Sequence, residues 1–276
     1  MGSLDGKVAF ITGAGRGQGR SHAIHLAEQG AAVVAVDICR DLPTIKYHMA
    51  SEDDLNHTAK LVQEVGGEIA TFTADVRDLN ALEEAAQLAV DTFGHIDIVV
   101  ANAGVLSFAK TWELTEDQWS EMIGINLDGV WKTVRATVPH MIKANRGGSI
   151  ILTSSTNGKK GYGNMSHYTA SKHGVVGLCK SLAVELSPYM IRVNTVNPTT
   201  VNTDMALNDS TYRVFMPDEA HPTEEQIRSG FQSINMLPIP WIEPADVSAA
   251  VVYLASNASR YVTASSMYID AGTTEL

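Results

Sequence analysis

Residues Val8–Gly19 read VAFITGAGRGQG, and this stretch decides the fold. Val8–Thr12 is an apolar run typical of a buried strand, and a glycine-rich segment follows it directly. Glycines let the backbone turn tightly and approach a pyrophosphate, while the N–H groups that open the next helix can bind an anion. The alternative is a tight turn that only needs small residues. The order of strand, turn and helix favours a dinucleotide site at Gly13, Gly15, Arg16, Gly17, Gln18 and Gly19.

Short apolar runs and longer helical patterns alternate along the whole chain. Strands are expected at Val8–Thr12, Ala32–Asp37, Ile69–Ala74, Ile96–Ala101, Ser149–Thr153, Ile191–Asn197 and Met267–Ile269. Helices are expected at Gly19–Gln29, Asp53–Val65, Leu79–Phe93, Trp119–Lys143, Tyr168–Leu186 and Pro244–Ala255. Consecutive apolar positions, as in Ile98–Ala101, are typical of strands covered on both faces. The pattern predicts an α/β chain: a three-layer Rossmann fold with a doubly wound, mostly parallel seven-stranded sheet, as one domain over residues 1–276.

Two segments interrupt this alternation. Residues 39–52 form an unusually long connection between a strand and a helix, since most such connections have about two to six residues. Residues 199–243 are expected to be irregular and are rich in large apolar side chains. Long segments of this kind are often lids or binding loops, and the apolar residues of 199–243 suit a lid over a hydrophobic substrate. The apolar residues could instead pack the core or a subunit interface.

Composition excludes several classes of protein. The 276 residues carry a net charge of −11, which disfavours nucleic acid as a partner. No run of 18 apolar residues predicts a transmembrane helix, so no membrane partner is expected. Cys39 and Cys179 lie far apart and outside any metal-binding pattern, which fits a reducing cytoplasm. His22 and His25 lack an evident third ligand, so no metal site is expected.

Acidic residues follow the second and third strands. Asp37 lies 18 residues after Gly19, where a carboxylate can bind ribose hydroxyls and repel a 2′-phosphate. This favours NAD over NADP, although Arg16 or Arg40 could meet such a phosphate. Asp75, at the third strand's end, could flank an adenine.

Small or polar residues follow the third and fourth strands. Asp75 and Val76 end the third strand, and Asp75 could instead cap the next helix, a role open equally to Asp78. Asn102-Ala103-Gly104 ends the fourth strand and allows close backbone contact with a nucleotide. Ligands of open α/β sheets bind at this edge, so both groups are expected to bind the cofactor.

Tyr168 and Lys172 stand four residues apart in an expected helix and therefore share one helix face. A nearby cation favours the phenolate, which would help tyrosine act as an acid or base near neutral pH. Such a spacing also arises on ordinary helix surfaces. Ser155 lies 13 residues before Tyr168, with Ser154 as its nearest competitor. Asn126 lies between two glycines that could loosen its helix.

Together, the glycine-rich turn, Asn102–Gly104, Asn126, Ser155, Tyr168 and Lys172 resemble the short-chain dehydrogenase/reductase family over essentially the whole chain. Asn197-Pro198 and Ile269-Asp-Ala-Gly272 also fit. The resemblance implies that Tyr168 exchanges the alcohol proton, Lys172 lowers its pKa and binds the nicotinamide ribose, and Ser155 binds the reacting oxygen. Asn126 would hold a water that links Lys172 to solvent. The implied cofactor-binding set also includes Ile38, Pro198, Thr199, Val201, Thr203, Tyr168 and Lys172.

A closer resemblance is to the mycofactocin-associated subgroup, which includes carveol dehydrogenases. It rests on Gly15-Arg-Gly-Gln-Gly-Arg-Ser-His22, Ala35-Val-Asp-Ile-Cys39, the long segment after it, Gly129-Val-Trp-Lys-Thr133 and Pro240-Trp-Ile-Glu-Pro244. The subgroup implies an insertion at 39–52 that lies near the cofactor and covers it. It also implies NAD held without ready exchange, electron transfer to mycofactocin, and a terpenoid-like secondary alcohol or ketone as substrate. Thr199, Ala264 and Ala271 depart from the glycine or other residue usual in the family, which puts local loop geometry in question.

Other functions remain open at this point. The protein could be an ordinary dehydrogenase or ketoreductase that exchanges NAD(P), or a nucleotide-binding protein without catalysis on the same fold. An epimerase or dehydratase could use the same Tyr168 and Lys172 with bound NAD. The family resemblance also implies a homotetramer built through the helices that carry Asn126 and Tyr168.

Overall fold

The computed structural model describes residues 2–216, 219 and 222–276. Over these residues, parallel strands form one seven-stranded sheet in the order β3-β2-β1-β4-β5-β6-β7. The strands are β1 (Val8–Thr12), β2 (Ala32–Asp37), β3 (Ile69–Thr73), β4 (Ile98–Ala101), β5 (Gly148–Thr153), β6 (Ile191–Pro198) and β7 (Ser266–Ile269). The chain leaves β1 toward β3 and returns to β4 on the other side of β1. This reversal creates the crevice where ligands bind in doubly wound sheets.

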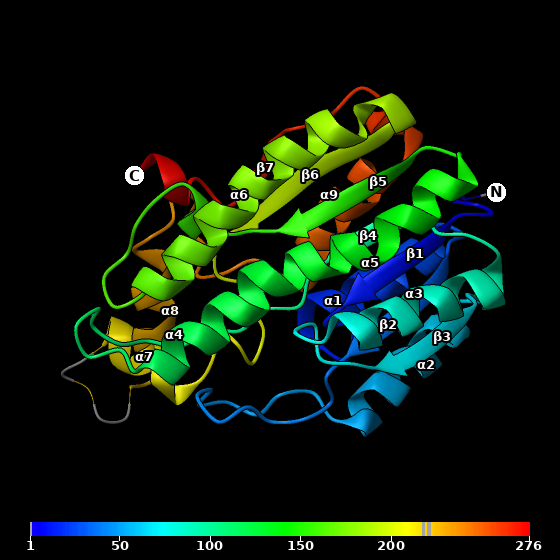
Figure 1. Cartoon of the computed structure of the whole chain (residues 1–276). Coiled ribbons are helices and arrows are strands. Elements are labelled where there is room, and N and C mark those ends of the chain that lie inside the picture. Colours follow the sequence, from blue (N-terminus) through cyan, green and yellow to red (C-terminus); the bar gives the residue numbers. More distant parts are fainter. Residues whose placement is uncertain (1, 217–218, 220–221) are drawn as a thin grey trace.

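Helices cover both faces of the sheet (Figure 1). Those on one face are α1 (Gly17–Glu28), α2 (Glu52–Glu64) and α9 (Pro244–Ala255). Those on the other are α3 (Leu79–Phe93), α5 (Gly129–Ala144) and α6 (Ser166–Leu186), with α4 (Glu116–Ile123) leading into α5. The predicted fold class, a three-layer Rossmann fold in a single domain, is confirmed.

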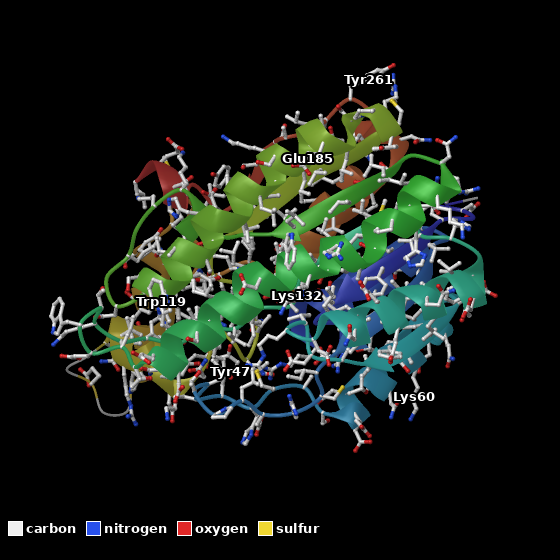
Figure 2. All side chains as sticks on the ribbon, viewed as in Figure 1. Tyr47, Lys60, Trp119, Lys132, Glu185 and Tyr261 are labelled. Carbon is white, nitrogen blue, oxygen red and sulfur yellow. The ribbon has the colours of Figure 1, made fainter. Side chains whose placement is uncertain are left out.

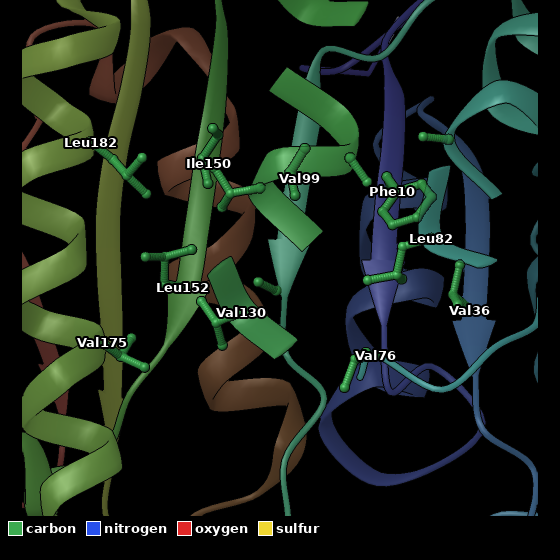
Figure 3. Packing of buried hydrophobic residues seen from close by; sticks show 14 of the residues in the cluster. Phe10, Val36, Val76, Leu82, Val99, Val130, Ile150, Leu152, Val175 and Leu182 are labelled. Atoms are coloured by element: carbon green, nitrogen blue, oxygen red, sulfur yellow. The ribbon is translucent and has the colours of Figure 1, made fainter. Parts of the chain in front are cut away.

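Apolar side chains from the strands fill the space beneath α3, α5 and α6. Phe10, Val99 and Ile150 point from β1, β4 and β5 toward Leu82 of α3 and Val175 of α6 (Figure 3). All five side chains are fully buried. Burying a side chain of this size contributes about 1.5–3 kcal/mol, so the consecutive apolar strands that identified the sheet also hold its layers together.

The helix predicted from Trp119 to Lys143 differs from the observed one in two ways. It begins earlier, at Glu116, because Thr115 and Gln118 form reciprocal capping hydrogen bonds. Its middle is a π-helix, Gly124–Asp128, which joins α4 to α5. The expectation that the glycines loosen this helix is therefore confirmed, since the wider turn starts at one and ends before the other.

Residues 199–243 are more regular than predicted, because they include α7 (Asp209–Phe215) and α8 (Glu224–Gln232). Asn208 and Thr223 cap the two helices. The ring of Phe231 lies 4.5 Å from that of Phe215 and 6.0 Å from that of Trp241, measured between centroids. Within this segment, Pro217, Asp218, Ala220 and His221 lie outside the described residues.

Residues 39–52 form a long connection, as predicted, and Cys39–Ser51 contains neither helix nor strand. The segment is nevertheless packed, since Leu42, Ile45 and Ala50 are buried. Over the ranges that the structure describes, no helix is both long and apolar enough to cross a membrane.

Candidate functional site

Two adjoining cavities lie at the carboxyl ends of the strands. Residues after β1, β2, β3 and β4 line the first cavity, which has a volume of about 470 Å³. Residues after β4, β5 and β6, together with α7 and α8, line the second cavity, of about 150 Å³. The residues that line both are Gln18, Asn102, Gly104, Val105, Thr203 and Met205.

The structure brings nearly all the predicted site residues to these cavities. Those at the first are Gly13, Arg16, Gly17, Gln18, Gly19, Asp37, Ile38, Asp75, Val76, Asn102, Ala103, Gly104 and Thr203. Those at the second include Ser155, Tyr168, Lys172, Pro198, Thr199 and Val201. Gly15 and Asn126 line neither cavity, and both support residues that do.

The glycine-rich turn is close-packed within itself and against the residues that follow β4. A Cβ atom at Gly13 would lie 2.8 Å from the Cα atom of Ala103, and the backbone there has a φ of +67°. A Cβ atom at Gly19 would lie 2.0 Å from the carbonyl oxygen of Gly13. Side chains at these positions would clash with backbone, so glycine is required for the turn to keep this shape.

Asp37 connects this turn to β2. The side chain is only 7% exposed, and its Oδ2 atom accepts a hydrogen bond of 2.8 Å from the Gly15 N–H. The backbone N–H of Cys39 donates to the other carboxylate oxygen at 3.2 Å. The carboxylate is thus fixed at the wall of the first cavity, with lone pairs left for a ligand.

Asp75 is the centre of a charged cluster at the same cavity. Arg77 donates to it at 2.7 Å and Arg40 at 3.2 Å. Burial opposes ionisation, but the hydrogen bonds and charge of Arg77 hold the pKa of Asp75 below its ordinary value. Asp78, not Asp75, caps α3 by accepting from the Asn80 and Ala81 N–H groups. This leaves Asp75 at the cavity, as the sequence suggested.

Tyr168 and Lys172 are buried at the inner end of the second cavity. The Lys172 Nζ atom lies 5.5 Å from the centre of the Tyr168 ring and donates to the Thr153 carbonyl oxygen at 2.8 Å. Burial raises the pKa of Tyr168 to about 12, opposed by a hydrogen bond with Ser155. Burial also lowers the pKa of Lys172 to about 8. In the protein alone, burial therefore outweighs the expected effect of the ammonium on the phenol.

The two candidate serines differ in their contacts. The Ser154 hydroxyl donates to the Lys172 carbonyl oxygen at 3.0 Å, which binds it to the backbone of α6. The Ser155 hydroxyl accepts from the Asn157 N–H at 3.2 Å and acts on Tyr168, whose pKa it lowers. The geometry therefore favours Ser155 as the serine that acts beside the phenol.

Asn126 lies behind the cavities, on the π-helix, and is fully buried. Its Oδ1 atom accepts from the Val105 N–H at 2.8 Å, and its Nδ2 atom donates to the Val105 carbonyl at 2.9 Å. A Cβ atom at Gly104 would lie 3.4 Å from this Oδ1 atom and 3.7 Å from the Lys172 Nζ atom. Asn126 and Lys172 thus approach the same point of the chain from two helices.

Comparison with known proteins agrees with this geometry. The short chain dehydrogenase family model matches residues 7–213. The chain belongs to the short chain dehydrogenase family. A (-)-trans-carveol dehydrogenase of Rhodococcus erythropolis is 50% identical over 275 residues, with 99% of each chain covered. The resemblance drawn from the sequence motifs is therefore confirmed.

Solved structures of the family show the same architecture over their full length. Carveol dehydrogenase from Mycobacterium avium, crystallised in complex with NAD, is 48% identical with a TM-score of 0.98, and both chains are covered completely. A short chain dehydrogenase from Mycobacterium paratuberculosis bound to NAD is 42% identical with a TM-score of 0.92, again with complete coverage.

Several contacts of this short chain dehydrogenase were not predicted from the sequence. Thr44 donates through its N–H to the buried carboxylate of Glu121 at 3.2 Å, and Glu121 also pairs with Arg77 at 3.1 Å. Tyr47 contacts Leu106 and Arg16. These residues are far apart in the chain, and neither periodicity nor motif spacing relates them.

Thr199, which departs from the family pattern, has a structural role. Its hydroxyl donates to the Asn235 side chain at 3.2 Å and lies 2.9 Å from the Thr273 hydroxyl. All three residues are buried. The hydroxyl thus joins the end of β6 to the segment after α8 and to the last turn of the chain.

The histidines considered as metal ligands have other partners. The His22 Nδ1 atom lies 2.8 Å from the Ser248 hydroxyl, and the His25 Nδ1 atom lies 2.8 Å from the Ser21 carbonyl oxygen. Among the residues described by the structure, no three His, Cys, Asp or Glu side chains gather as a metal site.

The buried Lys172 should make stability depend on pH. Its pKa of about 8 lies below the value near 10.4 for an unfolded chain, so between these pH values the unfolded state binds more protons. Burial of the ammonium therefore costs most below pH 8, and the cost falls as pH rises. Lys172→Met does not bear this cost, so its free energy of unfolding should exceed that of wild type at low pH. The excess should decrease by on the order of 3 kcal/mol between about pH 7.5 and 10.

Urea denaturation of nucleotide-free protein across this range measures the effect. Lys180→Met, which replaces an exposed lysine on the same helix, is the matched control. A difference between Lys172→Met and wild type that does not vary with pH would contradict the expected cost of burial.

Proposed function

We propose that the protein is an NAD-dependent oxidoreductase that acts on the CH–OH group of hydrophobic secondary alcohols and on the corresponding ketones. One observation carries the proposal. The Tyr168 phenol, the Ser155 hydroxyl and the Lys172 ammonium meet in the second cavity, whose wall is shared with the first. A proton-transfer group beside a nucleotide-sized groove is the arrangement that alcohol oxidation by a dinucleotide requires.

The first cavity fits NAD. The glycine-rich turn and the start of α1 offer N–H groups to the pyrophosphate, and Asp37 can accept from the adenosine ribose hydroxyls. Arg16 and Arg40, the cations that could have met a 2′-phosphate, pair with Asp204 and Asp75 at 3.1 and 3.2 Å. Two solved relatives with bound NAD support the same assignment.

When bound, NAD would supply the hydride acceptor for oxidation and NADH the donor for reduction. Tyr168 would take the alcohol proton, and Ser155 would donate a hydrogen bond to the reacting oxygen. With a pKa of about 8, Lys172 is largely protonated at neutral pH, so its charge can stabilise the phenolate form of Tyr168. Lys172 and Tyr168 would also contact the cofactor, together with Ile38, Val76, Pro198, Thr199, Val201 and Thr203.

Asn126 would connect Lys172 to solvent. The approach of its Oδ1 atom and the Lys172 Nζ atom to Gly104 supports a water-mediated relay at that point. The hydrogen bonds of Asn126 to both backbone groups of Val105 would keep the relay in place.

The substrate is proposed to be apolar and carveol-like. Apart from the reacting groups, the second cavity has a largely hydrophobic lining that includes Val105, Leu106, Phe108, Met165, Phe215, Phe231 and Ile234. Binding in such a pocket is driven by burial of apolar surface, with few polar groups to orient the ligand. The 50% identity to a (-)-trans-carveol dehydrogenase supports a terpenoid-like alcohol. Helices α7 and α8 would form the lid over it.

The segment 39–52 is proposed to cover the cofactor and slow its exchange. Leu42, His48, Met49 and Ala50 line the first cavity, and the contact of Thr44 with Glu121 anchors the segment to α4. A cofactor held in this way has to be re-oxidised in place, and mycofactocin is the electron acceptor proposed for that step.

Protein purified without added nucleotide should therefore contain NAD(H), seen by native mass spectrometry. An apolar secondary alcohol such as carveol should reduce the bound NAD, and NADH absorbance follows this single turnover. Isotope-labelled NAD in solution should take more than about an hour to exchange, well within known residence times.

The outcomes separate the competing functions. Failure of every alcohol in a broad panel to reduce bound NAD would favour a nucleotide-binding protein without catalysis. Exchange within seconds, with turnover supported by free NAD, would favour an ordinary exchanging dehydrogenase.

The same mass spectra report assembly, which is proposed to be a homotetramer. Trp119 of α4 and Trp131 of α5 are 43% and 45% exposed, so the helices around Asn126 present apolar surface that subunit contacts could bury. A cytoplasmic location is also proposed, because Cys39 and Cys179 are both free thiols.

A further inference from the structure

Tyr47 lies near the middle of the segment 39–52, at the lower edge of the molecule in Figure 2. Its phenolic oxygen accepts a hydrogen bond of 3.0 Å from the backbone N–H of Leu106. The guanidinium of Arg16 lies 5.6 Å from the centre of its ring. Since Arg16 lines the first cavity and Leu106 the second, Tyr47 contacts residues of both walls.

The residue next to Leu106 is held by Asn126. The backbone N–H of Val105 donates to the Asn126 side chain at 2.8 Å, and the Val105 carbonyl oxygen accepts from it at 2.9 Å. Two side chains from distant parts of the sequence therefore bind consecutive residues after β4. Asn126 binds Val105, and Tyr47 binds Leu106. Val105 lines both cavities, so a shift of its backbone would change the contacts of both the cofactor and the substrate.

The segment that carries Tyr47 has other anchors. Thr44 binds Glu121, Asp41 accepts from the Met49 N–H at 2.7 Å, and Leu42 and Ile45 are buried in the main core cluster. Tyr47 itself packs against the same cluster, which also contains Val105 and Tyr168. These anchors can keep the segment in place without the Tyr47 hydroxyl, so its hydrogen bond to Leu106 can have another role.

We propose that Tyr47 is a positioning residue. Its hydroxyl fixes the backbone at Leu106, and this keeps Val105 and the Asn126 side chain in place relative to Lys172. Tyr47 thus connects the segment 39–52, which lines the nucleotide cavity, to the part of the site where the proton is transferred. This inference rests on the proposed function. Removal of the hydroxyl leaves the Leu106 N–H without its acceptor and frees the backbone after β4 to shift, and displacements of about 1 Å can cost about 100-fold in rate.

The test is Tyr47→Phe in the NAD-loaded protein, with the rate of single-turnover NAD reduction by carveol as readout. The rate should fall by about tenfold, and the melting temperature of the loaded protein should stay within about 2 °C of wild type. Thr44→Val removes another anchor of the same segment, the hydroxyl that donates to the Glu121 carboxylate at 2.5 Å beside the backbone N–H. Tyr261→Phe removes the hydroxyl of an 85% exposed tyrosine. Both controls should keep the rate within about twofold.

A double-mutant cycle identifies the route of the effect. If Tyr47 acts through Asn126, adding Tyr47→Phe to Asn126→Ala should lower the rate by less than about twofold further. An equal loss in both backgrounds would overturn the proposal, as would an unchanged rate in Tyr47→Phe or an equal loss in Thr44→Val. These outcomes leave the proposed function intact. That function fails separately if no alcohol reduces the bound NAD.

Discussion

Tyr168→Phe should lower alcohol turnover by at least about 1,000-fold while leaving bound NAD in the protein. The phenol is the proposed proton acceptor, and proton transfer by a positioned side chain is worth about 10²–10⁴-fold. Phenylalanine keeps the ring that packs in the core, and the change affects only one of the proposed cofactor contacts, most of which line the first cavity. Turnover is measured with carveol and an artificial electron acceptor, and NAD content by mass spectrometry.

Tyr162→Phe is the matched control. Tyr162 also lines the second cavity, where its hydroxyl is buried. Loss of this hydroxyl should change turnover by less than about tenfold, as expected for one ligand contact. Turnover of Tyr168→Phe within tenfold of wild type would contradict the assignment of Tyr168 as the proton-transfer group.

Gly19→Ala should have the largest effect on cofactor binding. The new methyl group would lie 2.0 Å from the Gly13 carbonyl oxygen and 2.8 Å from the Asn102 Nδ2 atom, so the turn has to move. Overpacking of this kind costs about 1–3 kcal/mol, and the displaced N–H groups no longer face the pyrophosphate. We expect NAD content to fall at least tenfold, together with a lower melting temperature.

Gly163→Ala provides the comparison for this variant. Gly163 is exposed, and a Cβ atom there would meet nothing within 4 Å. The control should retain NAD and stability, since it adds a methyl group without a clash. Normal NAD content in Gly19→Ala would show that the turn tolerates a side chain, contrary to the packing described above.

The strands and the glycine-rich turn could be predicted because local patterns determine them. Buried parallel strands need consecutive apolar residues, as in Ile98–Ala101. A turn packed this closely needs glycine at Gly13 and Gly19. The spacing of Tyr168 and Lys172 on one helix could be read in the same way, and the structure places both in one cavity.

Long-range contacts could not be predicted in this way. The binding of Thr44 to Glu121 and of Tyr47 to Leu106 joins residues far apart in the chain, for which the sequence shows no spacing rule. Helix α8 was missed because its nine residues are too short for a clear period, and its capping box at Thr223 decides where it begins.

The pKa of Tyr168 also depends on tertiary structure. The sequence shows a cation four residues away, which favours phenolate. Only the packing reveals that burial raises the pKa to about 12 and that Lys172 donates to Thr153. In the structure burial raises this pKa and Ser155 lowers it, and burial has the larger effect.

The shared wall of the two cavities has an evolutionary consequence. Positions on α7 and α8, such as Thr211 and Phe231, face only the second cavity, so substitutions there can alter the range of alcohols accepted without a change in the cofactor. At Gly104 and Val105, one substitution alters both ligands at once. New substrate preferences should therefore arise by substitutions in α7 and α8. The residues after β4 should vary less, because a change there affects cofactor binding as well.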